Sequence, residues 1–189
     1  MLLLRGVGYE LLLLPDLSIE NCLYKRERYT CDYPYSSYSQ ERGILMLKNK
    51  VFLTQTDTTI GFVSQNTDKL TNIKQRPPHK HYIKAVNSLK TLKTFTRVPN
   101  SHKNTIRRAK KTTFILPDGY SYRVVKDKHH LLLLNRLKWA YTTSANLSSK
   151  VYDEDFAREV ADVVIEPLTQ NSQASKIYKL GKHTIKRIR

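Results

Sequence analysis

The sequence predicts an α/β protein, a single domain built on a twisted, mixed and partly parallel sheet with flanking helices. The first observation is that short predicted strands alternate with predicted helices from about residue 46 onward. The second is the Pro117-Asp118-Gly119 turn, which joins two such strands and is typical of a hairpin. The third is size, because 189 residues with 40% apolar content suffice to bury one core.

Each element is assigned from its local pattern, as the segment 67–74 illustrates. Leu70 and Ile73 fall on one face of a helix there, and Pro77 and Pro78 prevent that helix from continuing. By the same reasoning, further helices are expected at 88–94, 100–110, 129–137 and 153–160. Strands are expected at 51–54, 83–86, 112–116, 120–125, 139–144 and 163–166, and around Ile177 and Ile185.

The first 45 residues differ in kind from the rest. They contain two leucine-rich patches and then a polar stretch, 29–42, without a sustained period, so they cannot easily bury a core of their own. We therefore expect 1–45 to be a poorly ordered extension, or an over-extended reading of the gene with Met46 as the true start, and 46–189 to be the folded domain. The alternative is a genuine appendage that packs through 11–14.

The leucine-rich start is not expected to act as an export signal or a membrane span. Arg5 and Glu10 interrupt it and Pro15 ends it, which leaves no long apolar run. Cys22 and Cys31 are the two cysteines, and no Cys/His quartet has zinc-ligand spacing. Free thiols are the expectation and a loop disulfide is the alternative. These features predict a cytoplasmic protein that spans no membrane and supplies no metal-ligand cluster.

Charge divides the chain at the same place. Residues 1–45 hold 5 Lys or Arg and 6 Asp or Glu, whereas 46–189 hold 28 and 10, a net charge of +18. Such a surplus attracts polyanions and is screened by salt, so nucleic acid, nucleotides or an acidic membrane surface are admissible partners. The alternative is a basic surface without a dedicated partner.

Three short segments carry candidate chemistry: 54–62 (TQTDTTIGF), 72–80 (NIKQRPPHK) and 142–149 (TTSANLSS). Each joins hydroxyl, amide or guanidinium groups to a predicted strand or helix end, a combination that receives phosphate and carboxylate oxygens. No glycine-rich phosphate loop occurs, so side-chain cations would have to hold the phosphates of a nucleotide. We expect the three segments to form one anion-binding site.

The motifs inside these segments are Gln55-Thr56-Asp57-Thr58, Lys74-Gln75-Arg76-Pro77 and Ser144-Ala145-Asn146. Their order and composition resemble those of the YrdC-like family of L-threonylcarbamoyladenylate synthases. A weaker similarity extends over about residues 46–189. It runs through 112–116, Arg123 and Ser175-Lys176-Ile177.

The resemblance implies a YrdC-like domain with nucleotidyltransferase activity. L-Threonine, bicarbonate and ATP would condense to threonylcarbamoyl-AMP and pyrophosphate, and a downstream transferase would use the product to modify tRNA. ATP would be a substrate, with Mg²⁺ bridging its phosphates. The implied catalytic residues are Lys74 and Arg76. The implied nucleotide- and substrate-binding residues are Thr58, Thr113, Arg123, Ser144, Asn146, Ser175 and Arg187.

Each of these residues also has a purely structural interpretation. Lys74 and Arg76 are favourable at any helix C-terminus. Ser144 and Asn146 commonly close turns through bonds to their own backbone. The threonines are ordinary strand residues, and Arg187 belongs to a basic tail.

Several positions depart from the family pattern and favour a second hypothesis. Gln55 stands in place of the usual proline, Ile60 in place of a tyrosine, and Ala109 within a stretch that normally contains Pro-Gly. The second hypothesis is a non-catalytic module that binds double-stranded RNA or tRNA on the same scaffold. Its phosphate contacts would be Arg97, Lys103, Arg107, Arg108, Lys110 and Lys111. A third hypothesis is a carbamoyl-transfer module like those of hydrogenase maturation proteins, which are long multidomain chains.

Overall fold

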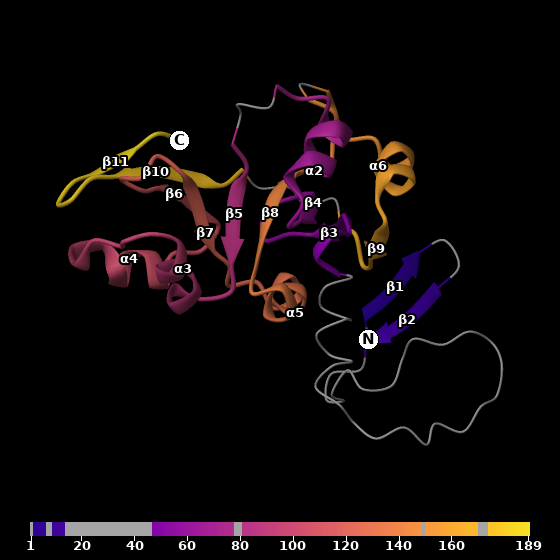
Figure 1. Ribbon diagram of the computed structural model, residues 1–189, viewed down its shortest axis with the longest axis horizontal. Helices are drawn as coiled ribbons and strands as arrows, with labels where there is room; N and C mark the ends of the chain where they lie inside the picture. Colours follow the sequence, from indigo (N-terminus) through magenta and orange to yellow (C-terminus); the bar gives the residue numbers. More distant parts are fainter. Residues whose placement is uncertain (1, 7–8, 14–46, 78–80, 149, 170–173) are drawn as a thin grey trace, which may run out of the picture.

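The computed structural model describes residues 2–6, 9–13, 47–77, 81–148, 150–169 and 174–189. Within them, the strands form one sheet in the order β11-β10-β6-β7-β5-β8-β4-β3-β9-β1-β2 (Figure 1). The pairs β10–β6, β5–β7 and β3–β9 are parallel and the other neighbours are antiparallel, which confirms the predicted mixed, partly parallel sheet. The strands are β1 (Leu2–Gly6), β2 (Tyr9–Leu13), β3 (Phe52–Gln55), β4 (Ile60–Ser64), β5 (Ile83–Val86), β6 (Thr112–Ile115), β7 (Ser121–Val124), β8 (Trp139–Ser144), β9 (Val163–Ile165), β10 (Lys176–Leu180) and β11 (Ile185–Arg187).

Helices cover both faces of this sheet. They are α2 (Thr67–Lys74), α3 (Leu89–Phe95), the 3-10 turn η1 (Asn100–His102), α4 (Lys103–Arg108), α5 (Lys128–Leu137) and α6 (Glu154–Val160). Ala85 and Ala140 pack with the leucines of α5, whereas the adjacent Val86 and Trp139 pack with α3 and α4. Because neighbouring residues of a strand point to opposite faces, α5 lies on one face and α3 and α4 on the other. None of the helices in the described ranges is long and apolar enough to cross a membrane.

A third apolar cluster fills the other end of the sheet. Leu53, Phe62 and Val164 pack there with Leu70 of α2 and Ala157 of α6. The layered arrangement of sheet and helices confirms the predicted α/β fold.

Three observed strands were not predicted: β4, and also β1 and β2, which lie in the segment that was expected to be poorly ordered. All five residues of β4 are buried, so the strand has no alternation of apolar and polar residues, and it begins directly after a turn. The predicted strands and helices elsewhere agree with the structure within one or two residues at most ends. The predicted helix 100–110 is instead η1 followed by the shorter α4.

At the N-terminal side, β1 pairs with β2 and also with β9, where Arg5 stands opposite Val164. The predictions for 14–46, including the free thiols of Cys22 and Cys31, fall outside the described residues. The division of the chain at residue 46 stays a prediction.

Candidate functional site

Thr56 builds the tight turn that connects β3 to β4. Its hydroxyl oxygen accepts hydrogen bonds from the backbone N–H groups of Thr58 at 3.3 Å and Thr59 at 3.2 Å. The same hydroxyl group donates to the Thr59 carbonyl oxygen at 2.6 Å. These bonds hold the side chains of Asp57 and Thr58 at the tip of the turn.

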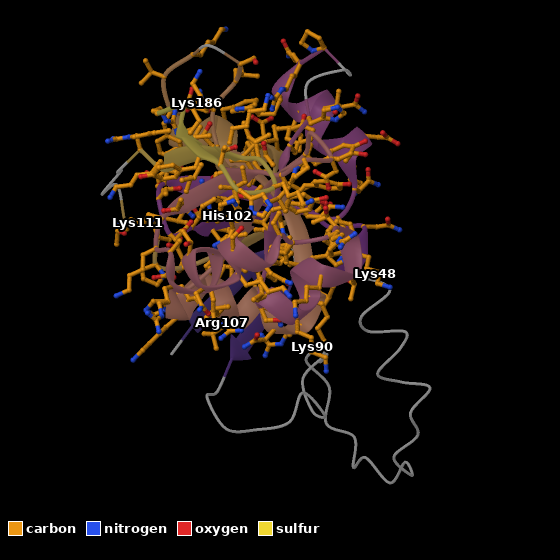
Figure 2. All side chains as sticks on the ribbon, turned by 90° about the vertical axis from the view of Figure 1, so that its left-hand side faces the viewer. Lys48, Lys90, His102, Arg107, Lys111 and Lys186 are labelled. Atoms are coloured by element: carbon orange, nitrogen blue, oxygen red, sulfur yellow. The ribbon has the colours of Figure 1, made fainter. Side chains whose placement is uncertain are left out.

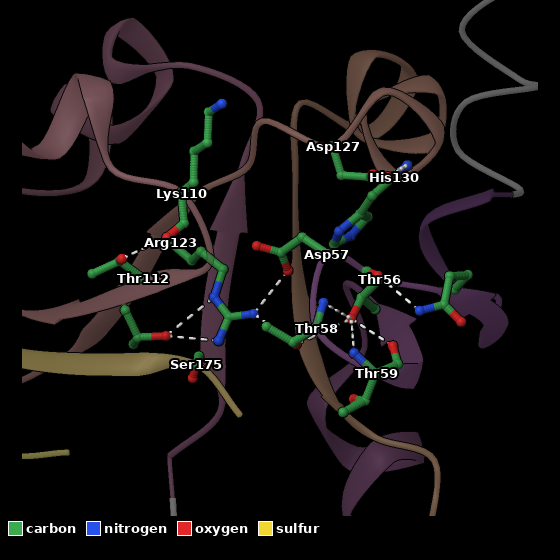
Figure 3. Close-up of polar contacts among 12 residues, drawn as sticks. Thr56, Asp57, Thr58, Thr59, Lys110, Thr112, Arg123, Asp127, His130 and Ser175 are labelled. Atoms are coloured by element: carbon green, nitrogen blue, oxygen red, sulfur yellow. Dashed lines mark hydrogen bonds and ion pairs between the residues drawn. The ribbon is translucent and has the colours of Figure 1, made fainter. Parts of the chain in front are cut away.

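Arg123 of β7 ties this turn to β6 through one guanidinium group (Figure 3). Its Nη1 donates to Asp57 Oδ1 at 2.8 Å and to Thr58 Oγ1 at 3.1 Å. Its Nε and Nη2 donate to Thr113 Oγ1 at 3.1 and 2.8 Å. The structure therefore brings the predicted residues Thr58, Thr113 and Arg123 together, and with Asp57 we call them the Arg123 cluster.

Asp57 is a member of this cluster that sequence analysis did not single out. The side chains of Asp57 and Arg123 are each only 5% exposed, and their ion pair is 2.8 Å long. A buried charge without its partner is strongly unfavourable, so each residue requires the other. The two residues lie 66 positions apart in the chain, and nothing local in the sequence indicates that they pair.

Lys74, the last residue of α2, organises the loop that follows β8. Its ammonium group donates to the Ser144 carbonyl oxygen at 3.0 Å, to Asn146 Oδ1 at 3.1 Å, and also to the Asn146 carbonyl oxygen. Asn146 Oδ1 in turn accepts a hydrogen bond from Ser144 Oγ at 2.5 Å. The predicted residues Lys74, Ser144 and Asn146 thus meet, and we call them the Lys74 cluster. Lys74 is buried, and its ammonium group is directed at the oxygens of this loop.

The two clusters lie at the same end of strands β4 and β8. Gly61 of β4 pairs with Ser144, and the Ala145 N–H donates to the Ile60 carbonyl oxygen at 3.1 Å. A β-carbon on Gly61 would lie 2.7 Å from the Thr143 carbonyl oxygen, so the close approach of these strands requires glycine at that position. Two chain segments that were predicted to share one site are therefore held together by strand pairing.

Arg76 belongs to neither cluster in this structure. Its Cζ lies 4.7 Å from the centre of the Tyr82 ring, and its side chain is half-buried against that ring. The guanidinium group makes no hydrogen bond to the residues that the structure describes, and its Nε is buried. Arg76 was predicted to share the site, but it makes no hydrogen bond to any of the other predicted residues.

Ser175 is buried and lies on the same face of the sheet as the Arg123 cluster. Ile177 of β10 stands opposite Thr113 of β6, and Ser175 has the same parity as Ile177 along the chain (Figure 3). The arginine that contacts Ser175 is Arg189, which donates from Nη2 to Ser175 Oγ at 3.0 Å and from Nε to the Ser175 carbonyl oxygen at 3.1 Å. The predicted Arg187 is exposed on β11, where the strand register places it opposite Tyr178, three residues beyond Ser175.

A cavity of about 350 Å³ opens beside Asp57. Gln55, which replaces the usual proline, forms part of its wall: the Gln55 side chain accepts a hydrogen bond from the Thr169 N–H at 3.2 Å and donates to the Thr56 carbonyl oxygen at 3.1 Å. The cavity is lined by Thr54, Gln55, Thr56, Asp57, Lys111, Asp127, His129, Ile165, Glu166, Pro167 and Thr169. A larger hollow of about 580 Å³ lies beside Tyr152 and Phe156, and none of the predicted site residues lines it.

Comparison with known proteins assigns the family. Residues 45–189 match the model of the Sua5/YciO/YrdC family, which carries the description "Telomere recombination". The chain belongs to this family. A curated relative, the uncharacterized protein MG259 homolog of Mycoplasma pneumoniae, is 31% identical over 160 residues, which are 76% of this chain and 33% of the relative. The chain thus matches about a third of that relative's length.

Solved structures of Sua5/YciO/YrdC proteins share the fold. P. abyssi Sua5 complexed with L-threonine has a TM-score of 0.65 at 15% identity, covering 83% of this chain and 55% of that one. E. coli YciO has a TM-score of 0.62 at 17% identity, covering 82% and 89%. HypF in a phosphate- and nucleotide-bound form has a TM-score of 0.64 at 14% identity, covering all of this chain and 25% of that one.

This Sua5/YciO/YrdC domain also buries a histidine beside the Arg123 cluster. His130 of α5 is 1% exposed, and neither ring nitrogen has a hydrogen-bond partner among the residues described. Figure 3 shows its side chain directed from α5 toward Asp57. Burial lowers the pKa of His130 to about 4, so the imidazole is neutral at pH 7. Sequence analysis did not identify His130.

The predicted RNA-binding residues lie together at one end of the domain. Arg97, Arg107, Arg108, Lys110 and Lys111 are exposed and Lys103 is half-buried. They lie on α4 or in the loops that follow α3 and α4, in the part of the domain that contains β5, β7, β6, β10 and β11. Segments 81–126 and 176–189, which form this part, contain 17 Lys or Arg against a single acidic residue, Asp118. Figure 2 shows Arg107, Lys111 and Lys186 on this side of the molecule.

No group of three or more His, Cys, Asp or Glu side chains suited to a metal ion occurs in the described part of the chain. Asp57, the carboxylate nearest the predicted nucleotide contacts, is already engaged with Arg123.

Proposed function

We propose that the chain is a cytoplasmic threonylcarbamoyl-AMP synthase, a nucleotidyltransferase of tRNA processing. The observation that carries this proposal is the placement of the Arg123 and Lys74 clusters at one end of β4 and β8, because six of the nine predicted catalytic and substrate residues belong to them. Membership of the Sua5/YciO/YrdC family supports it. So does the structure of the relative P. abyssi Sua5 with L-threonine.

The proposed reaction needs two anions held close together. The threonine amine and bicarbonate first condense to a carbamate with loss of water. A carbamate oxygen then attacks the α-phosphorus of ATP, and pyrophosphate leaves with the electrons of the broken P–O bond. Thr58, oriented by Arg123, would contact threonine, and Arg76 would contact phosphate or carboxylate oxygens with its planar fork. Lys74 would act indirectly by holding Ser144 and Asn146 in position. Mg²⁺ would arrive with ATP and bridge its phosphates.

The test is pyrophosphate release by the full chain in the presence of ATP, L-threonine and bicarbonate. We expect release to require all three substrates and to fall about 100-fold in the variant Arg76→Ala. Arg107→Ala, which removes an exposed arginine of α4, is the matched control and should retain activity. Pyrophosphate release that continues without threonine would contradict the proposed reaction.

A second candidate function is binding of double-stranded RNA or tRNA, which the basic end of the sheet favours. The 17 basic residues of this part stand against one acidic residue and, apart from the buried Arg123, would supply many phosphate contacts. Salt weakens specific and non-specific binding alike, so the useful measurement is competition between structured and unstructured RNA of equal length. Preference for structured RNA combined with no threonine-dependent pyrophosphate release would favour the binding module over the synthase.

A further inference from the structure

Tyr82 and Arg76 form a compact unit with Thr71 of α2. The Arg76 guanidinium lies 4.7 Å above the Tyr82 ring centre, and the Tyr82 hydroxyl lies 3.2 Å from Thr71 Oγ1. The Arg76 backbone N–H donates to the Thr71 carbonyl oxygen at 3.3 Å. Thr71 therefore anchors both the arginine backbone and the ring on which the arginine side chain rests.

The end of α2 gives this unit a defined geometry. Gln75 adopts a left-handed conformation, φ 47° and ψ 51°, and its N–H donates to the Asn72 carbonyl oxygen, which turns the chain sharply before Arg76. Pro77 follows and fixes the direction in which the chain leaves. The backbone on both sides of Arg76 is thus constrained without any contact from a ligand.

Stacking on an aromatic ring uses the face of a guanidinium group, whereas the N–H donors lie in its plane. In Arg76 the Nε–H is buried, so the terminal Nη groups are the donors left for a ligand. Those donors make no hydrogen bond to the residues described in the structure. Lys74 and Arg123, by contrast, direct their donors at protein oxygens. Among these three predicted cations, Arg76 is the one prepared to receive an external oxyanion.

We propose that Tyr82 is a positioning residue that presents the Arg76 fork to an oxyanion, the phosphate or carboxylate group of a substrate. This inference rests on the proposed function for the identity of the substrate, but not for the position of Arg76 on the Tyr82 ring. The Tyr82 ring orients the guanidinium plane, and the ring is held mainly by its own burial, with the bond to Thr71 in addition. Tyr82 itself touches no substrate.

The first test examines the protein without ligand. The Arg76 Nε–H, identified in ¹⁵N-resolved spectra by its loss in Arg76→Lys, is expected to exchange slowly with water in the natural chain and in Tyr82→Phe. In Tyr82→Leu it is expected to exchange at least tenfold faster, because the ring that covers it is gone. Equal exchange in Tyr82→Leu and the natural chain would overturn the proposal.

The second test measures ATP affinity by calorimetry in a double-mutant cycle. Tyr82→Leu is expected to weaken ATP binding about tenfold in the natural chain and to have no further effect in Arg76→Ala. An equal loss in both backgrounds would show that Tyr82 acts through general structure and would overturn the proposal. Emission of Trp139, the single tryptophan, is the folding control, since it packs 5.3 Å from Tyr141 in the same aromatic row. A chain that binds no ATP contradicts the proposed function, whereas the exchange rates decide the role of Tyr82 on their own.

Discussion

Arg123 and Arg76 are chemically identical side chains that the fold uses in opposite ways. Arg123 is almost completely buried, and all three of its nitrogens donate to side chains of the protein. Arg76 is half-buried, rests on an aromatic face, and makes no hydrogen bond to the described residues. We infer that Arg123 stabilises the structure of the site and that Arg76 binds the ligand. The consequence is that stability and ligand affinity should respond separately to changes at the two positions.

The largest expected effect is on the Arg123 side of this comparison. Asp57→Ala leaves the Arg123 guanidinium buried without its counter-charge, so we expect the free energy of unfolding to fall by about 4 kcal/mol. Urea unfolding followed by circular dichroism measures it. Asp68→Ala, which removes an exposed carboxylate from the first turn of α2, should cost under about 1 kcal/mol. Equal effects of the two substitutions would mean that the buried pair is not needed.

The second effect concerns the neutral histidine beside the same cluster. Burial lowers the pKa of His130 from 6.5 to about 4. Between pH 6.5 and pH 4, His130 is therefore mostly protonated in the unfolded chain and mostly neutral in the folded chain. Stability from this group is therefore present above pH 6.5 and is lost as the pH falls toward 4, by about 3 kcal/mol in total. Asp57 and Asp127 favour the charged form and Arg123 opposes it, but burial dominates.

The variant His130→Leu should remove this pH dependence. Unfolding free energies at pH 7 and pH 4 would differ by about 3 kcal/mol less in His130→Leu than in the natural chain. The adjacent His129 is exposed, so His129→Gln is the matched control and should keep the natural profile. Identical profiles for all three proteins would show that His130 is not buried in its neutral form.

Most strands of the sheet were predicted from the sequence, but not all of them. Strands such as 83–86 and 139–144 were predicted with the observed bounds because local pattern and flanking turns determine them. Strand β4 was missed because complete burial removes the alternation that identifies a strand. Local signals therefore predicted most of the fold, apart from β4 and from β1 and β2, which lie in the leucine-rich start where no strand was predicted.

The candidate site could be predicted from the sequence only in part. Thr58 and Asp57 stand in the same motif, but only the tertiary contact with Arg123, 66 positions away, shows that Asp57 is a buried ion-pair partner. His130 stands in no motif, and its burial beside this pair depends on the packing of α5. The late arginine shows the same limit, because the contact with Ser175 comes from Arg189 and depends on the register of β11.

Lys74 extends the comparison. It was predicted to contact the ligand, but like Arg123 it donates its hydrogen bonds to protein oxygens. The variant Lys74→Met leaves oxygens of Ser144 and Asn146 without their buried donor, and we expect a loss of about 2 kcal/mol in unfolding free energy. Lys69→Met removes a surface ion pair with Asp162 and should cost under about 1 kcal/mol. If Lys74→Met were as mild as Lys69→Met, Lys74 would belong with Arg76 as a group held for the ligand.

Arg76→Ala should have the smallest effect on stability, and this result would separate the two arginines most clearly. The substitution removes only the stacking on Tyr82 from the folded state, so the expected loss is about 0.5 kcal/mol. The same change should weaken ATP binding about 30-fold, as expected for the loss of a charge-assisted hydrogen-bond donor. Urea unfolding and calorimetry on the same preparation measure both quantities, with the exposed Arg107→Ala as the control. A large loss of stability with unchanged ATP affinity would reverse the assignment, because Arg76 would then support the fold as Arg123 does.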